Sequence, residues 1–94
     1  MKPNMKRYHA IVSGKVQGVF FRANAEAKAQ ELGVTGWVRN TPDGNVEIMF
    51  EGSEAAAKKM LDFCKTGPKW AKVEKIDVKE EKYKGEFSGF EVVH

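Results

Sequence analysis

The chain has 94 residues, of which 41% are apolar and 31% charged, and Lys and Arg outnumber Asp and Glu by 16 to 13. This length suits one domain, residues 1–94, with a modest core. No apolar run approaches the roughly 18 residues that could cross a bilayer, and no apolar segment of a secretory signal follows the N-terminal charges. The single cysteine, Cys64, cannot form an internal disulfide, which favours a reducing cytoplasm.

The charge is distributed unevenly along the chain. The first acidic residue is Glu26, and the basic residues that precede it are Lys2, Lys6, Arg7, Lys15 and Arg22. A basic N-terminal quarter raises the local concentration of small anions. We expect the first three of these side chains to form a solvated tail without a chemical role.

The first predicted element is a strand over residues 7–13, where side chains alternate between two faces. A helix is expected over residues 23–32, because apolar residues recur there at spacings of four and three. Gly33 follows at the position of a common helix C-cap. The residues expected to face the core are Tyr8, Ala10, Val12, Ala25, Ala29 and Leu32.

The second half of the chain begins with a predicted hairpin. Strands over residues 34–41 and 45–52 are joined by the turn Thr41-Pro42-Asp43-Gly44, which has the residues of a type I turn. Ser53 is a suitable N-cap for a second helix that ends at Gly67-Pro68. The expected core residues here are Val46, Ile48, Phe50, Ala57, Met60, Leu61 and Cys64.

The last part is predicted to contain a strand over residues 72–80, an exposed turn over 81–86 and a final strand over 89–93. The first six of these elements follow the order β-α-β-β-α-β, which predicts the α+β class and a ferredoxin-like fold. Such a fold has an antiparallel sheet with two helices on one face and leaves the other face partly open.

The segment 14–22, with the sequence GKVQGVFFR, joins the first strand to the first helix. A glycine-containing turn before a helix can direct several backbone N–H groups at one point, where the helix dipole adds positive charge. An arginine at the start of a helix is unfavourable unless an anion binds there. The residues expected to bind phosphate are therefore Lys15, Val16, Gln17, Gly18, Val19, Phe20, Phe21 and Arg22.

A second motif, Gly36-Trp37-Val38-Arg39-Asn40-Thr41, ends the second predicted strand in an amide side chain. Together the two motifs closely resemble the signatures of the acylphosphatase family, and the resemblance extends over essentially the whole chain. It implies hydrolysis of acyl phosphates to a carboxylate and inorganic phosphate, with phosphate as product inhibitor. In that family the arginine matching Arg22 binds phosphate, and the asparagine matching Asn40 positions the attacking water. We expect Thr41 to hold the Asn40 amide.

The proposed family mechanism lets the substrate's own phosphate oxygen accept the proton of water. Neither motif contains His, Cys, Asp or Glu, which agrees with that mechanism and with the absence of a metal or other cofactor. Within the loop, Val19 and Phe21 are expected to anchor the backbone in the core, while Gly14 and Gly18 supply unusual backbone angles. Phe20 is expected to affect the shape of the pocket mouth.

Several alternatives remain on the sequence alone. Arg22 by itself fits an exposed helix start, and Asn40 by itself fits a turn residue. An RNA-binding domain shares the order of elements, but it needs aromatic residues on the open face, where this chain has His9, Glu47 and Glu51. A non-catalytic acylphosphatase-like domain that binds phosphate is the main alternative function. We expect a cytoplasmic monomer that binds neither nucleic acid nor a membrane.

Overall fold

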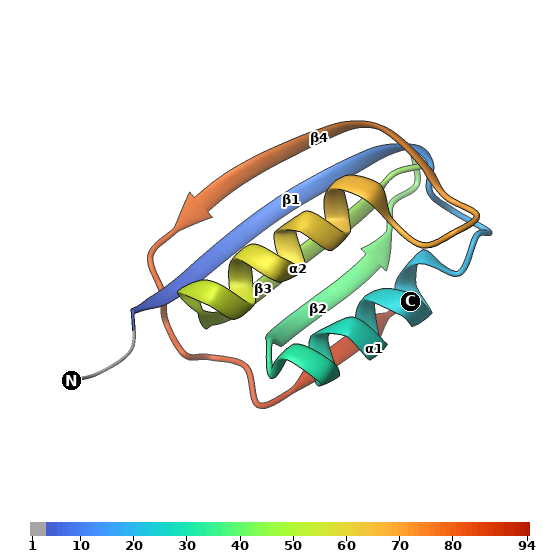
Figure 1. The fold of residues 1–94 in the computed structure, drawn as a ribbon. Helices are drawn as coiled ribbons and strands as arrows, with labels where there is room; N and C mark the ends of the chain where they lie inside the picture. Colours follow the sequence, from blue (N-terminus) through green and yellow to red (C-terminus); the bar gives the residue numbers. More distant parts are fainter. Residues whose placement is uncertain (1–3) are drawn as a thin grey trace.

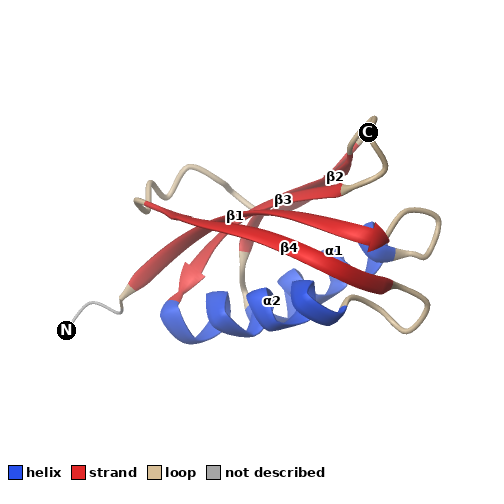
Figure 2. Cartoon of the chain, turned by 90° about the horizontal axis from the view of Figure 1, so that it is seen from above, coloured by secondary structure: helices blue, strands red, loops and turns tan. Residues whose placement is uncertain are grey.

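The computed structural model describes residues 4–94, so Lys2 lies outside the described residues. Two helices cover one face of a five-stranded sheet (Figures 1 and 2), and the α+β class and the predicted order of elements are confirmed. The elements are β1 (Met5–Lys15), α1 (Phe21–Leu32), β2 (Thr35–Asn40), β3 (Val46–Ser53), α2 (Glu54–Thr66), β4 (Lys72–Glu81) and β5 (Phe90–Val93).

The strands lie in the order β4-β1-β3-β2-β5. The pairs β4–β1, β1–β3 and β3–β2 are antiparallel, as expected, whereas β5 pairs parallel to β2. The sheet is therefore mixed and not wholly antiparallel. The chain leaves β4 at one edge, crosses to the opposite edge, and enters β5 in the direction of β2 (Figure 1).

The core lies between the sheet and the two helices. All of the inward positions predicted on the first and third strands are buried there, together with most of those predicted on the helices. Leu32 and Leu61 are partly buried and pack against this core. The fully buried predicted residues are Ala10, Val12, Ala25, Ala29, Val46, Ile48, Phe50, Ala57, Met60 and Cys64, each with no exposed surface.

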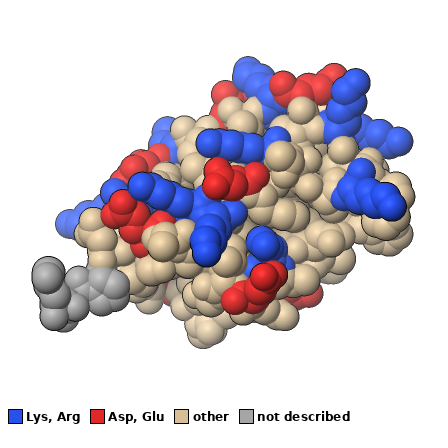
Figure 3. Space-filling model, viewed as in Figure 1, with Lys and Arg blue, Asp and Glu red and all other residues tan. Residues whose placement is uncertain are grey.

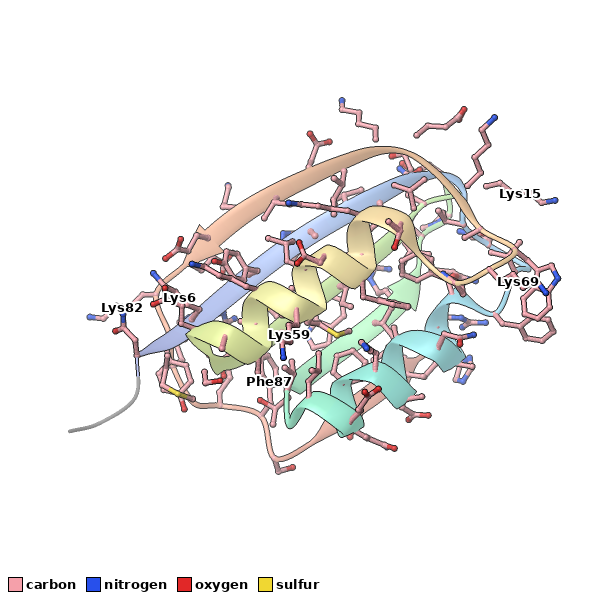
Figure 4. All side chains as sticks on the ribbon, viewed as in Figure 1. Lys6, Lys15, Lys59, Lys69, Lys82 and Phe87 are labelled. Carbon is pink, nitrogen blue, oxygen red and sulfur yellow. The ribbon has the colours of Figure 1, made fainter. Side chains whose placement is uncertain are left out.

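Arg7 is not part of a solvated tail, and that expectation was wrong. It is 5% exposed and lies in register between Glu51 on β3 and Glu81 on β4. Its guanidinium donates to Glu51 at 3.2 Å, to Glu81 at 3.1 Å and to Glu86 at 2.5 Å, and it lies 5.4 Å from the ring centre of Phe87, which Figure 4 labels. The cation is buried because three carboxylates balance its charge.

The segment 81–86 is largely exposed, as predicted, but it is anchored to the sheet. The backbone N–H groups of Lys84, Gly85 and Glu86 donate to the Glu51 carboxylate at 2.8, 3.2 and 3.3 Å. Glu51 is 1% exposed, so these bonds satisfy an acceptor that water does not reach. The segment thereby covers part of the sheet face that was expected to be open.

Candidate active site

The end of β1 and the turn that joins it to α1 contain three residues with positive φ. Gly14, Gly18 and Phe20 have φ values of 121°, 73° and 64°. A Cβ atom on Gly14 would lie 2.3 Å from the carbonyl oxygen of Lys72, which explains the glycine where β1 and β4 change register. The expectation that both glycines supply unusual backbone angles is confirmed.

Buried side chains fix the turn to the core. Val16, Val19 and Phe21 are 1%, 5% and 2% exposed, so Val19 and Phe21 anchor the loop as predicted. No hydrogen bond that joins turns or loops within residues 4–94 uses a backbone N–H of residues 17–21 as its donor. These N–H groups lie beside the N-terminus of α1, whose first turn carries no acidic residue. A turn with such donors and partial positive charge can bind an anion.

Gln17 has a side-chain role that the sequence did not indicate. Its Nε2 donates to the carbonyl oxygens of Thr41 and Asn45, both at 2.8 Å. These carbonyls flank the β2–β3 turn, which begins directly after Asn40. One amide therefore fixes the β1–α1 turn to the end of the strand that carries the second predicted catalytic residue.

Arg22 and Asn40 line the same cavity, which has a volume of about 330 Å³. Both side chains are half-buried, so each can contact a ligand and still be held by its surroundings. Of the other residues predicted to bind phosphate, Val16, Gly18, Phe20 and Phe21 line this cavity, and Lys15, Gln17 and Val19 do not. The full lining is Val16, Gly18, Phe20, Phe21, Arg22, Ala23, Glu26, Asn40 and Val92.

Thr41 contributes to the turn. Its hydroxyl donates to the Asp43 carboxylate and accepts from the backbone N–H of Asn45 at 3.0 Å. No hydrogen bond from Thr41 to the Asn40 amide is among those formed by residues 4–94. Any effect of Thr41 on Asn40 therefore acts through the position of the strand end.

Four residues at the site were not predicted: Ala23, Glu26, Val92 and His94. Glu26 lies one helical turn after Arg22 and brings a carboxylate to the cavity, which the spacing along the helix could have indicated. Val92 reaches the cavity from β5. His94 accepts a hydrogen bond at its Nδ1 from the Arg22 guanidinium at 3.2 Å. No local sequence signal relates positions so far apart.

The centre of the exposed sheet face is occupied by charged groups. Glu47 accepts from His9 Nε2 and from Arg39 Nε, each at 2.6 Å. Burial raises the pKa of the Glu47 carboxyl, but the hydrogen bonds from His9 and Arg39 outweigh it and the net shift is downward. This side of the sheet thus carries an ion-pair network where an RNA-binding sheet would carry stacking aromatic rings.

Lysine side chains lie at the end of the molecule that contains the cavity. Lys15 at the end of β1 and Lys69 in the α2–β4 loop are both exposed there (Figure 4), and Figure 3 shows basic side chains over the same end.

Within residues 4–94, no group of three His, Cys, Asp or Glu side chains is placed to hold a metal ion. In the same residues no helix is long and apolar enough to cross a membrane.

Known proteins share this sequence pattern and fold. A family model described as acylphosphatase matches residues 8–92. An acylphosphatase of Roseiflexus sp. (strain RS-1) is 51% identical over 90 residues, which cover 96% of this chain and 97% of that protein.

Two solved structures extend the comparison. An acylphosphatase from Coxiella burnetii has a TM-score of 0.89 and 38% identity, and the match covers 96% of this chain and 94% of that one. Full-length HypF in its phosphate- and nucleotide-bound form has a TM-score of 0.85 and 26% identity, but the match covers only 12% of that longer chain. The resemblance seen in the two motifs is therefore confirmed, and the chain belongs to the acylphosphatase family of enzymes.

Proposed function

We propose that this chain hydrolyses acyl phosphates to a carboxylate and inorganic phosphate by attack of water on phosphorus at the cavity beside the β1–α1 turn. The observation that carries the proposal is that Arg22 and Asn40, 18 positions apart in the chain, line one cavity together with the turn. An acyl phosphate already has a good leaving group, because the carboxylate that departs is stable. Positioning and charge stabilisation can therefore supply most of the catalysis.

The phosphoryl group is held by the backbone N–H groups of residues 17–21 and by the guanidinium of Arg22. The planar guanidinium can donate two parallel hydrogen bonds to phosphate oxygens. Arg22 also donates to His94, and this bond holds the guanidinium at the cavity. Because these donors also bind the product, inorganic phosphate is a competitive inhibitor.

Asn40 orients the nucleophile. Its side-chain oxygen accepts a hydrogen from water and leaves the water lone pair directed at phosphorus. A neutral amide is a poor base, so the proton goes to a phosphate oxygen of the substrate. Glu26, which also lines the cavity, is the competing candidate for a general base.

The principal experiment measures benzoyl phosphate hydrolysis by the purified chain and by variants at the two positions. Arg22→Ala should lower kcat/KM by about 10²- to 10³-fold, the typical effect of removing one charge-stabilising donor, and should weaken inhibition by phosphate. Arg22→Lys should restore only part of this loss, because an ammonium cannot make the bidentate contact. Asn40→Ala should lower kcat steeply and phosphate affinity much less.

A matched variant tests the route of the proton. Glu26→Gln keeps the size of the side chain and removes its basicity, so it should retain most of the activity if the substrate accepts the proton. A loss as large as that of Asn40→Ala would make Glu26 the base.

Activity should also survive EDTA, since the proposed charge stabilisers are amides and a guanidinium. Loss of activity in EDTA with recovery on adding a divalent ion contradicts the mechanism.

The alternative function is phosphate binding without turnover, in the manner of a domain within a larger protein. The match to a small part of HypF is the observation that favours it. Phosphate binding by the folded chain with no hydrolysis of benzoyl phosphate would establish this alternative. We further propose that the chain acts as a monomer in the cytoplasm. Its single cysteine, which is free, supports a reducing compartment, and sedimentation of the purified protein tests whether it is a monomer.

A further inference from the structure

Phe20 has an unusual backbone conformation for its residue type. Among the described residues it is the only one other than glycine with a positive φ, 64°. Such a conformation is costly for a bulky side chain and persists where the surroundings impose it. Both the backbone N–H and the side-chain Nδ2 of Asn24 donate to the Phe20 carbonyl, at 3.0 and 2.8 Å. These two bonds fix the Phe20 carbonyl at the start of α1.

This conformation directs the Phe20 side chain away from the core. The residue is 66% exposed, although the flanking Val19 and Phe21 are almost fully buried. Phe20 also lines the cavity that contains Arg22 and Asn40. Core packing does not account for an exposed ring placed at a backbone cost beside the phosphate site.

Trp70, from the α2–β4 loop, supports the Phe20 ring. The two rings meet edge to face, with centroids 5.7 Å apart, a favourable arrangement for aromatic pairs. Trp70 is itself 59% exposed, and the Lys69 ammonium lies 5.7 Å from its ring centre. The α2–β4 and β1–α1 loops lie side by side in Figure 1, and Figure 4 labels Lys69 at their tip.

The loop that carries Trp70 is held in place. The Gly67 N–H donates to the Phe63 carbonyl at 2.7 Å, and the Ala71 N–H donates to the Pro68 carbonyl at 3.0 Å. Lys69 engages the Trp70 ring. Trp70 does not line the cavity and Phe21 is buried, so Phe20 is the exposed aromatic residue of the lining.

We propose that the Phe20 ring, supported by Trp70, contacts the acyl group of the substrate and selects aromatic acyl phosphates over short alkyl ones. This inference rests on the proposed function, since it assigns the acyl part of the same substrate. With the phosphoryl group at Arg22, the acyl group must leave the cavity past its lining, and Phe20 is the large exposed apolar residue there. Phe20 is the specificity-determining residue, and Trp70 is a positioning residue.

The test compares kcat/KM for benzoyl phosphate with kcat/KM for acetyl phosphate, whose methyl group is too small to cover an aromatic ring. Phe20→Gly should lower the benzoyl-to-acetyl ratio by about three- to tenfold, the size expected of one aromatic contact. The same variant should raise the melting temperature, because glycine adopts positive φ without strain. Trp70→Ala should lower the ratio by a smaller factor.

Phe20→Leu is the matched control, because it keeps apolar surface and removes the flat ring. It should give a ratio between those of the wild type and Phe20→Gly. An unchanged ratio in folded Phe20→Gly, or an equal loss on both substrates, overturns the assignment of the acyl subsite. Failure of the wild-type chain to hydrolyse either substrate overturns the proposed function itself, so the two failures are distinguishable.

Discussion

The Gln17 amide provides the sharpest test of how the two halves of the site are held together. Its Nε2 donates two hydrogen bonds of 2.8 Å, to the carbonyls of Thr41 and Asn45. A neutral hydrogen bond contributes about 0.5–1.5 kcal/mol to stability, so Gln17→Ala, which removes two, should lower the free energy of unfolding by about 1–3 kcal/mol. For a chain of this size, each kcal/mol lost lowers the melting temperature by roughly 4–8 °C.

The isosteric variant Gln17→Glu should be more damaging than the truncation. At neutral pH it would place a carboxylate oxygen, which cannot donate, against two carbonyl oxygens. The pairs would repel each other, and the destabilisation should exceed that of Gln17→Ala by about 1 kcal/mol or more. Because protonation of the new carboxylate restores a donor, the destabilisation of Gln17→Glu should shrink as the pH falls towards the ordinary range of glutamate pKa values. Urea unfolding at pH 7 and pH 5 measures both effects.

The same contact should influence catalysis. Because Gln17 fixes the turn that follows Asn40, both variants should lower kcat for benzoyl phosphate more than they weaken inhibition by phosphate. Wild-type stability of Gln17→Glu at pH 7 would show that its amide does not donate to these carbonyls. Loss of stability with unchanged kcat would show that the contact is structural and does not position Asn40.

Three further predictions concern the surrounding structure. Gly14→Ala places a Cβ 2.3 Å from the Lys72 carbonyl oxygen at a φ of 121°, so urea unfolding should show a loss of at least about 2 kcal/mol. Burial raises the pKa of the Glu51 carboxyl, but hydrogen bonds from the backbone N–H groups of Lys84 and Gly85 and from Arg7 outweigh it, so the pKa lies below its ordinary 4.5. The contribution of Glu51 to the free energy of unfolding should be complete above pH 4.5 and should decline as the pH falls through the lowered value. Urea unfolding over a series of pH values measures this decline, which should be missing in Glu51→Gln. Burial raises the pKa of the Cys64 thiol to about 12, so iodoacetamide at pH 8 should label it only in denaturant, as mass spectrometry will show.

Local sequence patterns predicted the elements and the inner faces of β1, β3, α1 and α2. Strand alternation in β1 and β3 and the helical spacing in α1 depend on near neighbours, and the structure confirms the burial that they indicated. The two motifs also predicted that a turn and a strand end would meet, and Arg22 and Asn40 do line one cavity. The fold brings them together because β1 and β2 flank β3.

The contacts that the sequence did not indicate join distant parts of the chain. Arg7 reads as part of a basic tail because its partners Glu51, Glu81 and Glu86 lie 44 to 79 positions away. The side chain of Gln17 likewise finds its acceptors only after the β2–β3 turn has formed. Hydrophobic periodicity reports which face of an element is buried, but it does not report which polar partner an element will meet.

This difference bears on how the proposed mechanism operates. A site that relies on backbone N–H groups, a guanidinium and an amide has no strong general base to compensate for misplaced groups, so its rate depends on geometry. The turn is accordingly fixed from independent directions: by the buried side chains of Val16 and Phe21, and by the Gln17 contact to the β2–β3 turn. Loosening either support should therefore lower kcat even though every group that touches the substrate remains present.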